Sequence, residues 1–300
     1  MASISDSSGT DWCAWRLGRF RAALGARGLS PRTATSYAWN TAAFVRWLGG
    51  TYGRWPSPGE VTALDVADYR RWLQDRGRKP ATANQALKAL SAYFRWAAAE
   101  GLVSGNPAVG VKAVPEQRAG PRWLGRRELG LLAAAVQQHG ALRDRALFAL
   151  LLHAGLRVSE ACSLRVADLE LRERSGVVRV REGKGGKYRE VPLNVTARKA
   201  LSEHMAARAG GEWLFVSRKG SRLSARAAER AIVRYARLAG LEGVTPHSLR
   251  HTFCKMLVDA GESLDRVAAL AGHANLNTTA RYTKPSLQDL ERAVDRIAWE

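Results

Sequence analysis

The sequence predicts a mainly α-helical protein of two domains, the second of which also contains a small antiparallel sheet. Three observations support this prediction. A chain of 300 residues is long enough for two domains, each with its own core. Helical patterns fill residues 11–105 and return after residue 122, and strand signals occur only in the second part. Between them, residues 106–122 carry prolines and glycines that forbid a long helix, so this stretch is predicted to be a linker.

Helix-start signals divide residues 11–105 into four helices. Asp11 begins the first, Ser30-Pro31 caps the second, and Thr62–Asp65 approximates a capping box for the third. The fourth is expected over about 81–100. Aromatic side chains line these helices on the apolar side and are expected in the core. The segment is therefore predicted to be a four-helix domain.

Basic residues gather around the third and fourth of these helices. They are Arg70, Arg71, Arg76, Arg78, Lys79 and Lys88. Two interpretations stay open for them, a solvated face and a face that follows phosphates along DNA. The net charge of +20 favours the second, because both parts of the chain share it: residues 1–110 carry 14 basic and 7 acidic residues, and the remainder carries 33 and 20. Two basic domains on a linker are expected to close around a nucleic acid duplex from opposite sides.

Cysteine usage and hydropathy indicate the compartment. The three cysteines are widely spaced and form no CxxC pair, so we expect a reducing, cytoplasmic environment. Residues 1–10 are polar and Ser-rich, which predicts a flexible N-terminus without a hydrophobic signal segment. No run of about 18 apolar residues occurs, so no membrane is expected among the partners.

Residues 123–300 are predicted to form the α+β domain. An apolar helix ends at Gly155, and the next begins at Arg157, with Glu160 one turn further on. An arginine at a helix start, with a carboxylate three residues later, suits a contact to phosphate. An ordinary surface ion pair between Arg157 and Glu160 is the alternative.

Strand signals follow over residues 177–180 and 188–193, which are expected to pair as a β-hairpin. The Gly-rich tip of this hairpin, residues 183–187, carries Lys184. It does not fit the P-loop pattern, because no Ser or Thr follows a Gly-Lys pair. A lysine on such a tip can reach into a groove or donate a proton. A short strand is also expected over 213–216.

The segment from Thr245 to Tyr282 concentrates the chemistry. Thr245 caps a helix in which His247, Arg250 and His251 share one face. Further on lies His273, at the end of a second, shorter helix that Gly272 terminates. The buried side is expected to consist of Phe253, Met256, Leu257, Leu264, Val267 and Leu270. Two histidines, an arginine and a tyrosine in one region suit the attack of a tyrosine on a phosphodiester held by the arginine.

Two other interpretations compete for this segment. His247 and His251 lie four residues apart and could be zinc ligands, but the charge of Arg250 opposes a cation and no Glu follows His247. A helix-turn-helix is the second, with Val267–Gly272 as its first helix and Asn277–Tyr282 as its recognition helix. After Tyr282, residues 286–299 are predicted to form an amphipathic helix. Its apolar side consists of Leu287, Leu290, Val294 and Ile297.

At five places the sequence resembles the tyrosine recombinase (phage integrase) family in its simple, Xer-like form. The matching stretches, in the order expected of the family, are Gly155–Glu160, Gly183–Lys187, His247–His251, Gly272-His273 and Tyr282. Each is a weak or moderate signal alone, whereas all five in order are highly specific. The resemblance is strong over about 124–285 and looser over 11–105. Lys284 departs from the pattern, since many relatives have His there.

The resemblance implies a tyrosine-recombinase fold, with a SAM-like core-binding domain in front of the catalytic domain. It implies that Tyr282 attacks the scissile phosphate, leaving a 3′-phosphotyrosyl link and a free 5′-hydroxyl. Arg157 and Arg250 would bind the phosphate, and Lys184 would protonate the leaving 5′-oxygen. His247 would assist proton transfer. The remaining implied site residues are His273, which would donate a hydrogen bond to the phosphate, and Glu160 and His251, which would support the site.

The implied partner is double-stranded DNA with paired recombination half-sites. The family acts as a homotetramer on two such sites, in which the helix over 286–299 docks on a neighbouring subunit. No ATP or metal cofactor is expected, because the phosphotyrosyl bond conserves the energy of the phosphodiester. The implied role is integration, excision, transposition or dimer resolution. Two alternatives remain: a helix-turn-helix regulator without catalysis, and a type IB topoisomerase with the same chemistry.

Overall fold

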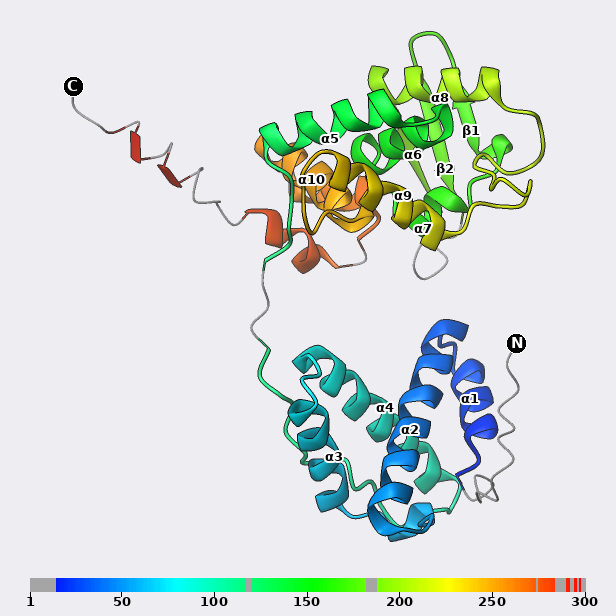
Figure 1. The fold of residues 1–300 in the computed structure, drawn as a ribbon, viewed down its shortest axis with the longest axis vertical. Helices are drawn as coiled ribbons and strands as arrows, with labels where there is room; N and C mark the ends of the chain where they lie inside the picture. Colours follow the sequence, from blue (N-terminus) through cyan, green and yellow to red (C-terminus); the bar gives the residue numbers. More distant parts are fainter. Residues whose placement is uncertain are drawn as a thin grey trace. The chain divides into compact units, whose positions relative to one another are not determined.

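The computed structural model describes residues 15–116, 120–181, 188–273, 275–283, 290–291, 294–295 and 297. The chain divides into two compact units, Met1–Arg118 and Ala119–Glu300, each with its own hydrophobic core (Figure 1). The fold is mainly helical with one small antiparallel sheet, which confirms the predicted fold class. Within the described residues, no helix is both long and apolar enough to cross a membrane.

The described part of the first unit consists of four α-helices and a short 3-10 turn. They are α1 (Leu17–Ala26), α2 (Pro31–Tyr52), α3 (Ala63–Asp75) and α4 (Pro80–Ala99), with η1 (Pro58–Glu60) between α2 and α3. Two predicted caps are present: the Ser30 hydroxyl accepts from the Thr33 amide, and Thr62 forms a capping box with Asp65. Helix α2 packs against α1 and α4, which builds the core of the unit (Figure 1).

The first helix begins later than the sequence analysis predicts from Asp11. Helix α1 starts at Leu17, and Trp15 lies in the turn before it. Trp15 is fully buried. Its indole nitrogen donates to the Pro56 carbonyl at 3.0 Å, and its own carbonyl accepts from the Tyr93 hydroxyl at 3.0 Å. The Trp15 carbonyl thus has a tertiary partner in place of a helical one. Residues 11–14 lie outside the described residues.

The chain that follows α4 stays against the first unit. The Asn84 side chain donates to the Val114 carbonyl at 2.9 Å and accepts from the Val114 amide at 2.8 Å. The Arg70 guanidinium donates to the Lys112 carbonyl at 2.8 Å. The first part of the segment predicted as a linker therefore packs on the helical unit.

The second unit contains seven described α-helices and three strands. They are α5 (Arg126–His139), α6 (Leu142–His153), α7 (Val158–Cys162), β1 (Leu169–Leu171), β2 (Gly176–Val180), β3 (Arg189–Pro192), α8 (Val195–Ala207), α9 (Ala225–Leu238), α10 (Pro246–Asp259) and α11 (Leu264–Ala271). Three 3-10 turns complete the described part: η2 (Val166–Asp168), η3 (Leu276–Thr278) and η4 (Ala280–Thr283).

The sheet has the order β1-β2-β3 and is antiparallel throughout. Val178 on β2 faces Val191 on β3, which confirms the predicted hairpin; its tip, residues 182–187, lies outside the described residues. Strand β1 was not expected, because three residues are too few to show an alternating pattern. The strand expected over 213–216 is absent from the described part, where Trp213 and Val216 form only isolated bridges.

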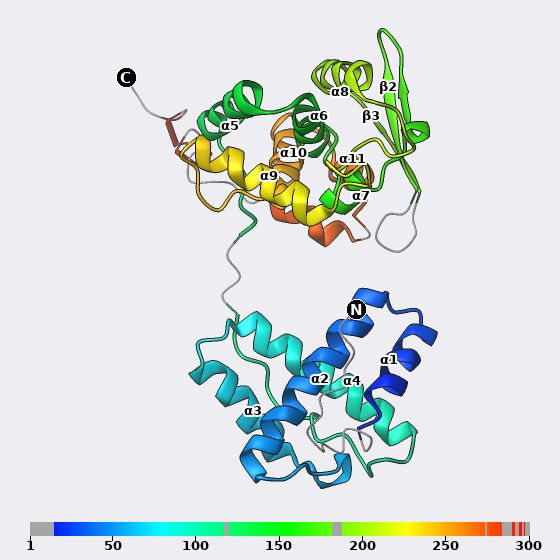
Figure 2. The ribbon, with the colours of Figure 1, turned by 45° about the vertical axis from the view of Figure 1, so that its right-hand side comes forward.

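Helix α6 is the centre of the second unit. Leu147, Leu150 and Leu151 on this helix are completely buried. Helix α6 packs against α8 on one side and α10 on the other, while α8 lies over the sheet (Figure 2). Because residues 146–152 of α6 are apolar on all sides, this part of the helix requires neighbours on every side. This packing brings the end of α6, the start of α7 and the buried face of α10 together, and these segments carry the candidate site.

Candidate active site

Helix α10 presents the predicted His-x-x-Arg-His group from a well-capped first turn. The Thr245 amide donates to the Ser248 hydroxyl at 2.8 Å, and Ser248 donates its own hydroxyl proton to the Thr245 carbonyl at 2.7 Å. Pro246 occupies the first helical position, as expected. The cap fixes the direction of the helix, and with it the positions of His247 and Arg250.

Arg250 is the most deeply buried charged side chain of the group, with 2% of its surface exposed. Its guanidinium donates to two backbone carbonyls, that of Gly155 before α7 and that of Ala271 at the end of α11. Among the described residues, no carboxylate forms an ion pair with it. Burial, and then repulsion from Arg157, lower the pKa of Arg250 to about 10, so the group stays charged at neutral pH.

Arg157 lies beside Arg250, as the sequence predicts. Its guanidinium donates to Glu160 at 2.7 Å and to the Gly272 carbonyl at 3.0 Å, and its backbone amide donates to the other Glu160 oxygen at 2.9 Å. Glu160 is buried, whereas about a quarter of the Arg157 side chain is exposed, at 26%. The pair is therefore not the ordinary surface ion pair of the alternative interpretation, and Arg157 keeps an open side from which a ligand can be reached.

Arg189 is a member of the cluster that the sequence analysis missed. It projects from β3, donates to Glu160 at 2.7 Å, and donates through Nε to the Leu270 carbonyl at 3.1 Å. Burial would raise the pKa of Glu160, but hydrogen bonds from Arg189 and Arg157 outweigh burial and hold that pKa below its usual value. A charged residue in a four-residue strand has the pattern of an exposed side chain, so only the tertiary structure reveals its role.

Tyr282 and three histidines form the second half of the site. The Tyr282 hydroxyl lies 2.6 Å from His251 Nδ1, and the rings of Tyr282 and His273 stack with centroids 6.3 Å apart. His247 meets His251 edge to face at 4.2 Å. His273 is oriented by Thr279, whose hydroxyl lies 2.9 Å from its Nδ1. The tyrosine itself is buried, in a small core cluster with Phe253 and Cys254.

The environment keeps the imidazoles neutral and the phenol protonated. Burial, followed by nearby positive groups, lowers the pKa of His251 and of His273 to about 4. Burial and then Arg250 lower the pKa of His247 as well. Burial raises the pKa of Tyr282, and the adjacent Cys254 raises it further. At neutral pH the tyrosine therefore carries its proton, and the histidines around it have a free nitrogen lone pair.

The site as a whole has an excess of positive charge. Among the described residues, the three guanidinium groups of Arg157, Arg189 and Arg250 have one carboxylate close to them, that of Glu160, and only Arg157 and Arg189 bind it. Buried charge is costly unless it is paired, so such a site favours an anion with at least one negative charge. Three His, Cys, Asp or Glu side chains arranged to hold a metal do not occur in the described part of the chain.

Some sequence predictions for this region are wrong or lie outside the described residues. The helix-turn-helix is not formed, since Leu276–Thr283 makes two 3-10 turns instead of a recognition helix. Met256, expected inside, is 44% exposed, because α11 and η4 cover the adjacent face of α10. Lys184 and most of the predicted helix over 286–299 lie outside the described residues.

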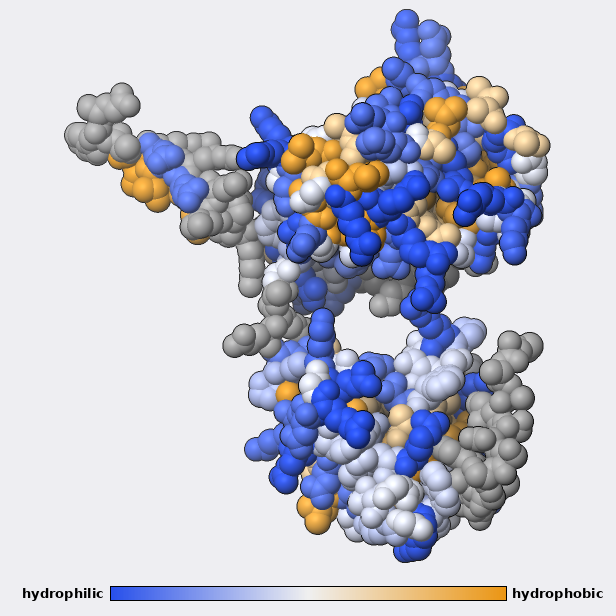
Figure 3. Space-filling view, in the orientation of Figure 1, coloured by the Kyte–Doolittle hydropathy of each residue, from blue (hydrophilic) through white to orange (hydrophobic). Residues whose placement is uncertain are grey.

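Helix α9 presents a basic surface that the sequence analysis did not single out. Arg226, Arg230, Arg234 and Arg237 recur every three or four residues and are all exposed, so they share one face. The opposite face packs against α5 and α7. Figure 3 shows hydrophilic side chains gathered on the side of the second unit where α9 lies. The spacing of these arginines was a signal available in the sequence.

The basic residues predicted on the first unit differ in their exposure and in the contacts that they already make. Arg70 is half buried and holds Lys112, and Arg76 stacks on Trp72 at 4.6 Å. The other four, Arg71, Arg78, Lys79 and Lys88, are exposed. Arg71 lies on α3 and Lys88 on α4, whereas Arg78 and Lys79 lie in the connection between these two packed helices.

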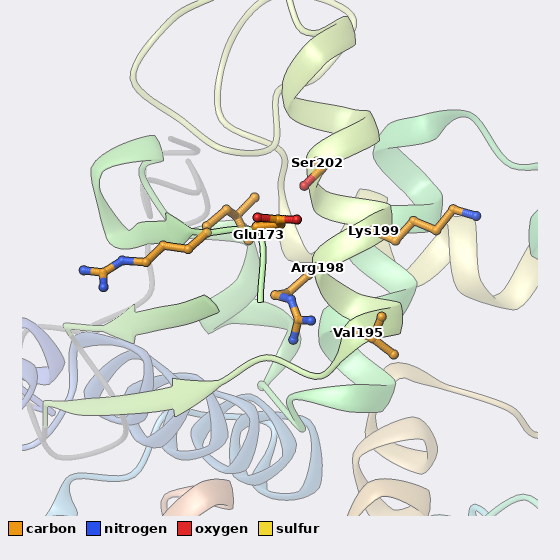
Figure 4. Close-up of a pocket in the computed structure, with 7 residues that line it drawn as sticks. Glu173, Val195, Arg198, Lys199 and Ser202 are labelled. Carbon is orange, nitrogen blue, oxygen red and sulfur yellow. The ribbon is translucent and has the colours of Figure 1, made fainter. Parts of the chain in front are cut away.

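A separate pocket of the second unit lies between the sheet and α8. It is formed by the end of β1 and the first turns of α8, and Arg198, Lys199 and Glu173 line it (Figure 4). Arg198 already donates to the Leu193 carbonyl at 3.0 Å. None of the predicted site residues borders this pocket.

Comparison with known proteins shows the family to which this fold belongs. Residues 122–288 match the family model described as "Phage integrase family", and residues 17–102 match "Phage integrase, N-terminal SAM-like domain". The chain therefore belongs to the phage integrase family of tyrosine recombinases and is a DNA-binding, site-specific recombinase enzyme.

Similar proteins cover nearly the whole chain. Tyrosine recombinase XerC of Rhodospirillum centenum is 39% identical over 279 residues, which are 88% of this chain and 80% of that protein. Tyrosine recombinase XerA of Thermococcus kodakarensis is 32% identical over 281 residues, or 92% and 93% of the two chains.

Two solved structures share the fold. One is the XerH site-specific recombinase bound to palindromic difH substrate in a post-cleavage complex, with a TM-score of 0.75 at 24% identity, covering 93% of this chain and 84% of that one. The other is a lambda integrase dimer bound to a COC′ core site, with a TM-score of 0.74 at 22% identity, covering 89% and 96%.

Proposed function

We propose that this recombinase cuts and rejoins DNA through a 3′-phosphotyrosyl intermediate with Tyr282 as the nucleophile. One observation supports this most strongly: Tyr282 lies next to a cluster of three arginines that has a single carboxylate to balance it. A phosphodiester supplies the missing negative charge. A tyrosine hydroxyl beside a bound phosphodiester is placed for attack on phosphorus.

We assign the other site residues the roles that the resemblance to the family implies. Arg157 and Arg250 bind the non-bridging oxygens and stabilise the charge that builds up in the transition state. His273, oriented by Thr279, donates a hydrogen bond to the phosphate. His247 lies at the exposed edge of the site and assists proton transfer, and Lys184 protonates the leaving 5′-oxygen. The reaction conserves the phosphodiester energy, so it requires neither ATP nor a metal.

Both units bind the DNA. The exposed basic face of α9 and the exposed basic residues of α3 and α4 contact phosphates along the duplex, which supplies most of the affinity. The duplex carries paired recombination half-sites. The biological role is integration, excision, transposition or dimer resolution.

The active assembly is a homotetramer on two sites, joined by the segment 286–299 docking on a neighbouring subunit. The pattern of Leu287, Leu290, Val294 and Ile297 supports this, because an apolar stripe requires a partner surface. Truncation after Pro285 should leave binding to a single half-site intact and abolish cooperative assembly. Full recombination activity in the truncated protein would contradict the exchange.

The test of the chemistry begins by identifying the DNA sequence that the protein cleaves. Incubating the full chain with fragmented genomic DNA of its source organism, denaturing, and sequencing the DNA that stays attached to protein should give one recurring sequence. A labelled duplex of that sequence, nicked next to the cleavage point, should then trap a covalent complex that survives in excess chelator. Tyr282→Phe should bind the duplex and give no covalent band. Tyr188→Phe, which alters an exposed tyrosine on the same unit, should still give the band.

The same protein and DNA substrates distinguish the proposal from two alternative functions. A regulator without catalysis gives no covalent band with the wild-type chain. A type IB topoisomerase gives the band and relaxes supercoils, but does not exchange strands between two differently marked copies of the site. Recombinant products joining the two marks support the proposal.

A further inference from the structure

We propose that His251, through Nδ1, is the group that takes the phenolic proton of Tyr282 during attack. This inference rests on the proposed function, since it assigns a catalytic role next to the nucleophile named above. The evidence is the 2.6 Å separation between Tyr282 Oη and His251 Nδ1, the shortest polar contact of the phenol among the described residues.

The surroundings of the phenol leave it dependent on such a partner. Tyr282 is 1% exposed, so water has little access to its hydroxyl. Burial raises its pKa, and the neighbouring Cys254 cannot accept the proton readily, because burial also raises the pKa of that thiol and keeps it protonated. Attack by an intact phenol must release a proton, and His251 is the adjacent group with a free lone pair.

His251 is held in place to act on this proton. It lies on α10 one turn after His247, whose ring it meets at 4.2 Å, and one residue after the buried Arg250. The charged or titratable groups that face it are His247 and Arg250 from α10, His273 after α11, and Arg281 and Tyr282 from η4. His247, at the exposed edge, offers a way for the proton to reach solvent afterwards.

Binding of DNA should strengthen His251 as a base. Its low pKa comes first from burial and then from repulsion by the positive groups around it. A phosphodiester anion held by Arg157 and Arg250 offsets that repulsion, which raises the proton affinity of the imidazole. The imidazole is therefore a weak base in the free protein and a stronger one when the substrate is bound, so the tyrosine is not activated in the absence of DNA.

The Tyr282 oxygen forms a bond to phosphorus while its proton passes to His251 Nδ1, in the tautomer that carries its other hydrogen on Nε2. The bond from phosphorus to the 5′-oxygen breaks, and that oxygen takes a proton from Lys184. In rejoining, the 5′-hydroxyl returns its proton to Lys184 as it attacks phosphorus, and the departing Tyr282 oxygen recovers a proton from the His251 imidazolium.

The test compares single-turnover cleavage of the nicked duplex by full-length variants. His251→Gln keeps a polar group beside the phenol but cannot take a full proton, so we expect cleavage about 100-fold slower, with DNA binding unchanged. Replacing Tyr282 with a fluorinated tyrosine, whose phenol is more acidic, should restore most of the rate in His251→Gln and change the wild-type rate little. His153→Gln, a half-buried histidine on α6 outside the cluster, is the matched control.

A second variant separates chemistry from folding. His251→Ala leaves a space beside the phenol, and added imidazole should increase its cleavage rate, whereas a variant that is merely misfolded does not respond to imidazole. The inference is overturned if His251→Gln cleaves at the wild-type rate, or if neither the acidic phenol nor imidazole raises the rate of the slow variants. In those cases wild-type protein still forms the Tyr282 complex, so the proposed function stands. Loss of the covalent band in the wild-type chain would instead remove the proposed function itself.

Discussion

Glu160 accepts hydrogen bonds from Arg189 through both carboxylate oxygens, at 2.7 and 3.2 Å. Glu160 also binds Arg157, and Arg189 also binds the Leu270 carbonyl on α11. One carboxylate thus connects the strand that leads out of the β-hairpin with the first arginine of the site and with the end of α11. Arg189 positions the residues that bind phosphate and does not need to touch it.

Removing Arg189 should destabilise the second unit and misplace the site. Arg189→Met leaves Glu160 buried with one partner, and breaking a buried pair costs about 3 kcal/mol or more. Chemical unfolding of the full chain should show this loss. Arg172→Met, which removes an exposed partner of Glu170, is the control and should change little, because Arg172 is 74% exposed. Equal unfolding curves for the two variants would contradict the buried-pair account.

Gly155 should not tolerate a side chain. Its φ of +61° is left-handed, and an added Cβ would lie 2.2 Å from the Phe253 ring. Gly155→Ala should therefore lose about 2 kcal/mol or more of stability, and cleavage should slow because the Gly155 carbonyl binds Arg250. Gly130→Ala, in open space on α5, should instead gain about 0.5 kcal/mol. Similar melting temperatures for the two variants would disprove the steric argument.

The sequence predicts those parts of the site that depend on local patterns of residues. Thr245-Pro246 gives the start of α10, and the three- and four-residue spacing places His247, Arg250 and His251 on one side of it. Arg157 and Glu160 are close for the same local reason, since they lie on one helical turn. Such contacts depend on backbone geometry that a short stretch of sequence specifies.

The part that could not be predicted depends on contacts between distant segments. Arg189 meets Glu160 across 29 positions of sequence, and Trp15 meets Tyr93 across 78. Neither partner carries a local signal of the other, because a buried arginine in a strand resembles an exposed one until its neighbours are known. The burial of Tyr282 against His251 likewise depends on η4 packing on α10.

The basic face of α9 should determine the salt dependence of DNA binding. Arg230→Gln removes one exposed positive charge from that face, so the slope of log affinity against log salt should fall by about 1 if Arg230 contacts a phosphate. Arg172→Gln, an arginine already paired with Glu170, should leave the slope unchanged. Titrations of a labelled duplex at several salt concentrations measure both. Identical slopes for wild type and Arg230→Gln would exclude Arg230 from the phosphate contacts.

Stability should fall on mild acidification. The pKa values of His251 and His273 are about 4 in the folded chain, below the usual 6.5, so the unfolded chain binds more protons between those values. The contribution of these two histidines to the free energy of unfolding is complete above pH about 6.5 and is lost as the pH falls towards about 4. Thermal unfolding of the full chain should show that acidification lowers the stability of His251→Gln less than that of wild type. His139→Gln, an exposed imidazole on α5, should behave as wild type.

The residue that becomes joined to DNA can be identified chemically. The covalent complex trapped on the nicked duplex is digested with protease and nuclease, and the peptide that carries a nucleotide is located by mass spectrometry. We expect a nucleotide attached through its 3′-phosphate to Tyr282, with a free 5′-hydroxyl on the other DNA end. A nucleotide on any other residue, or one attached through a 5′-phosphate, would show that Tyr282 is not the nucleophile of a 3′-phosphotyrosyl reaction.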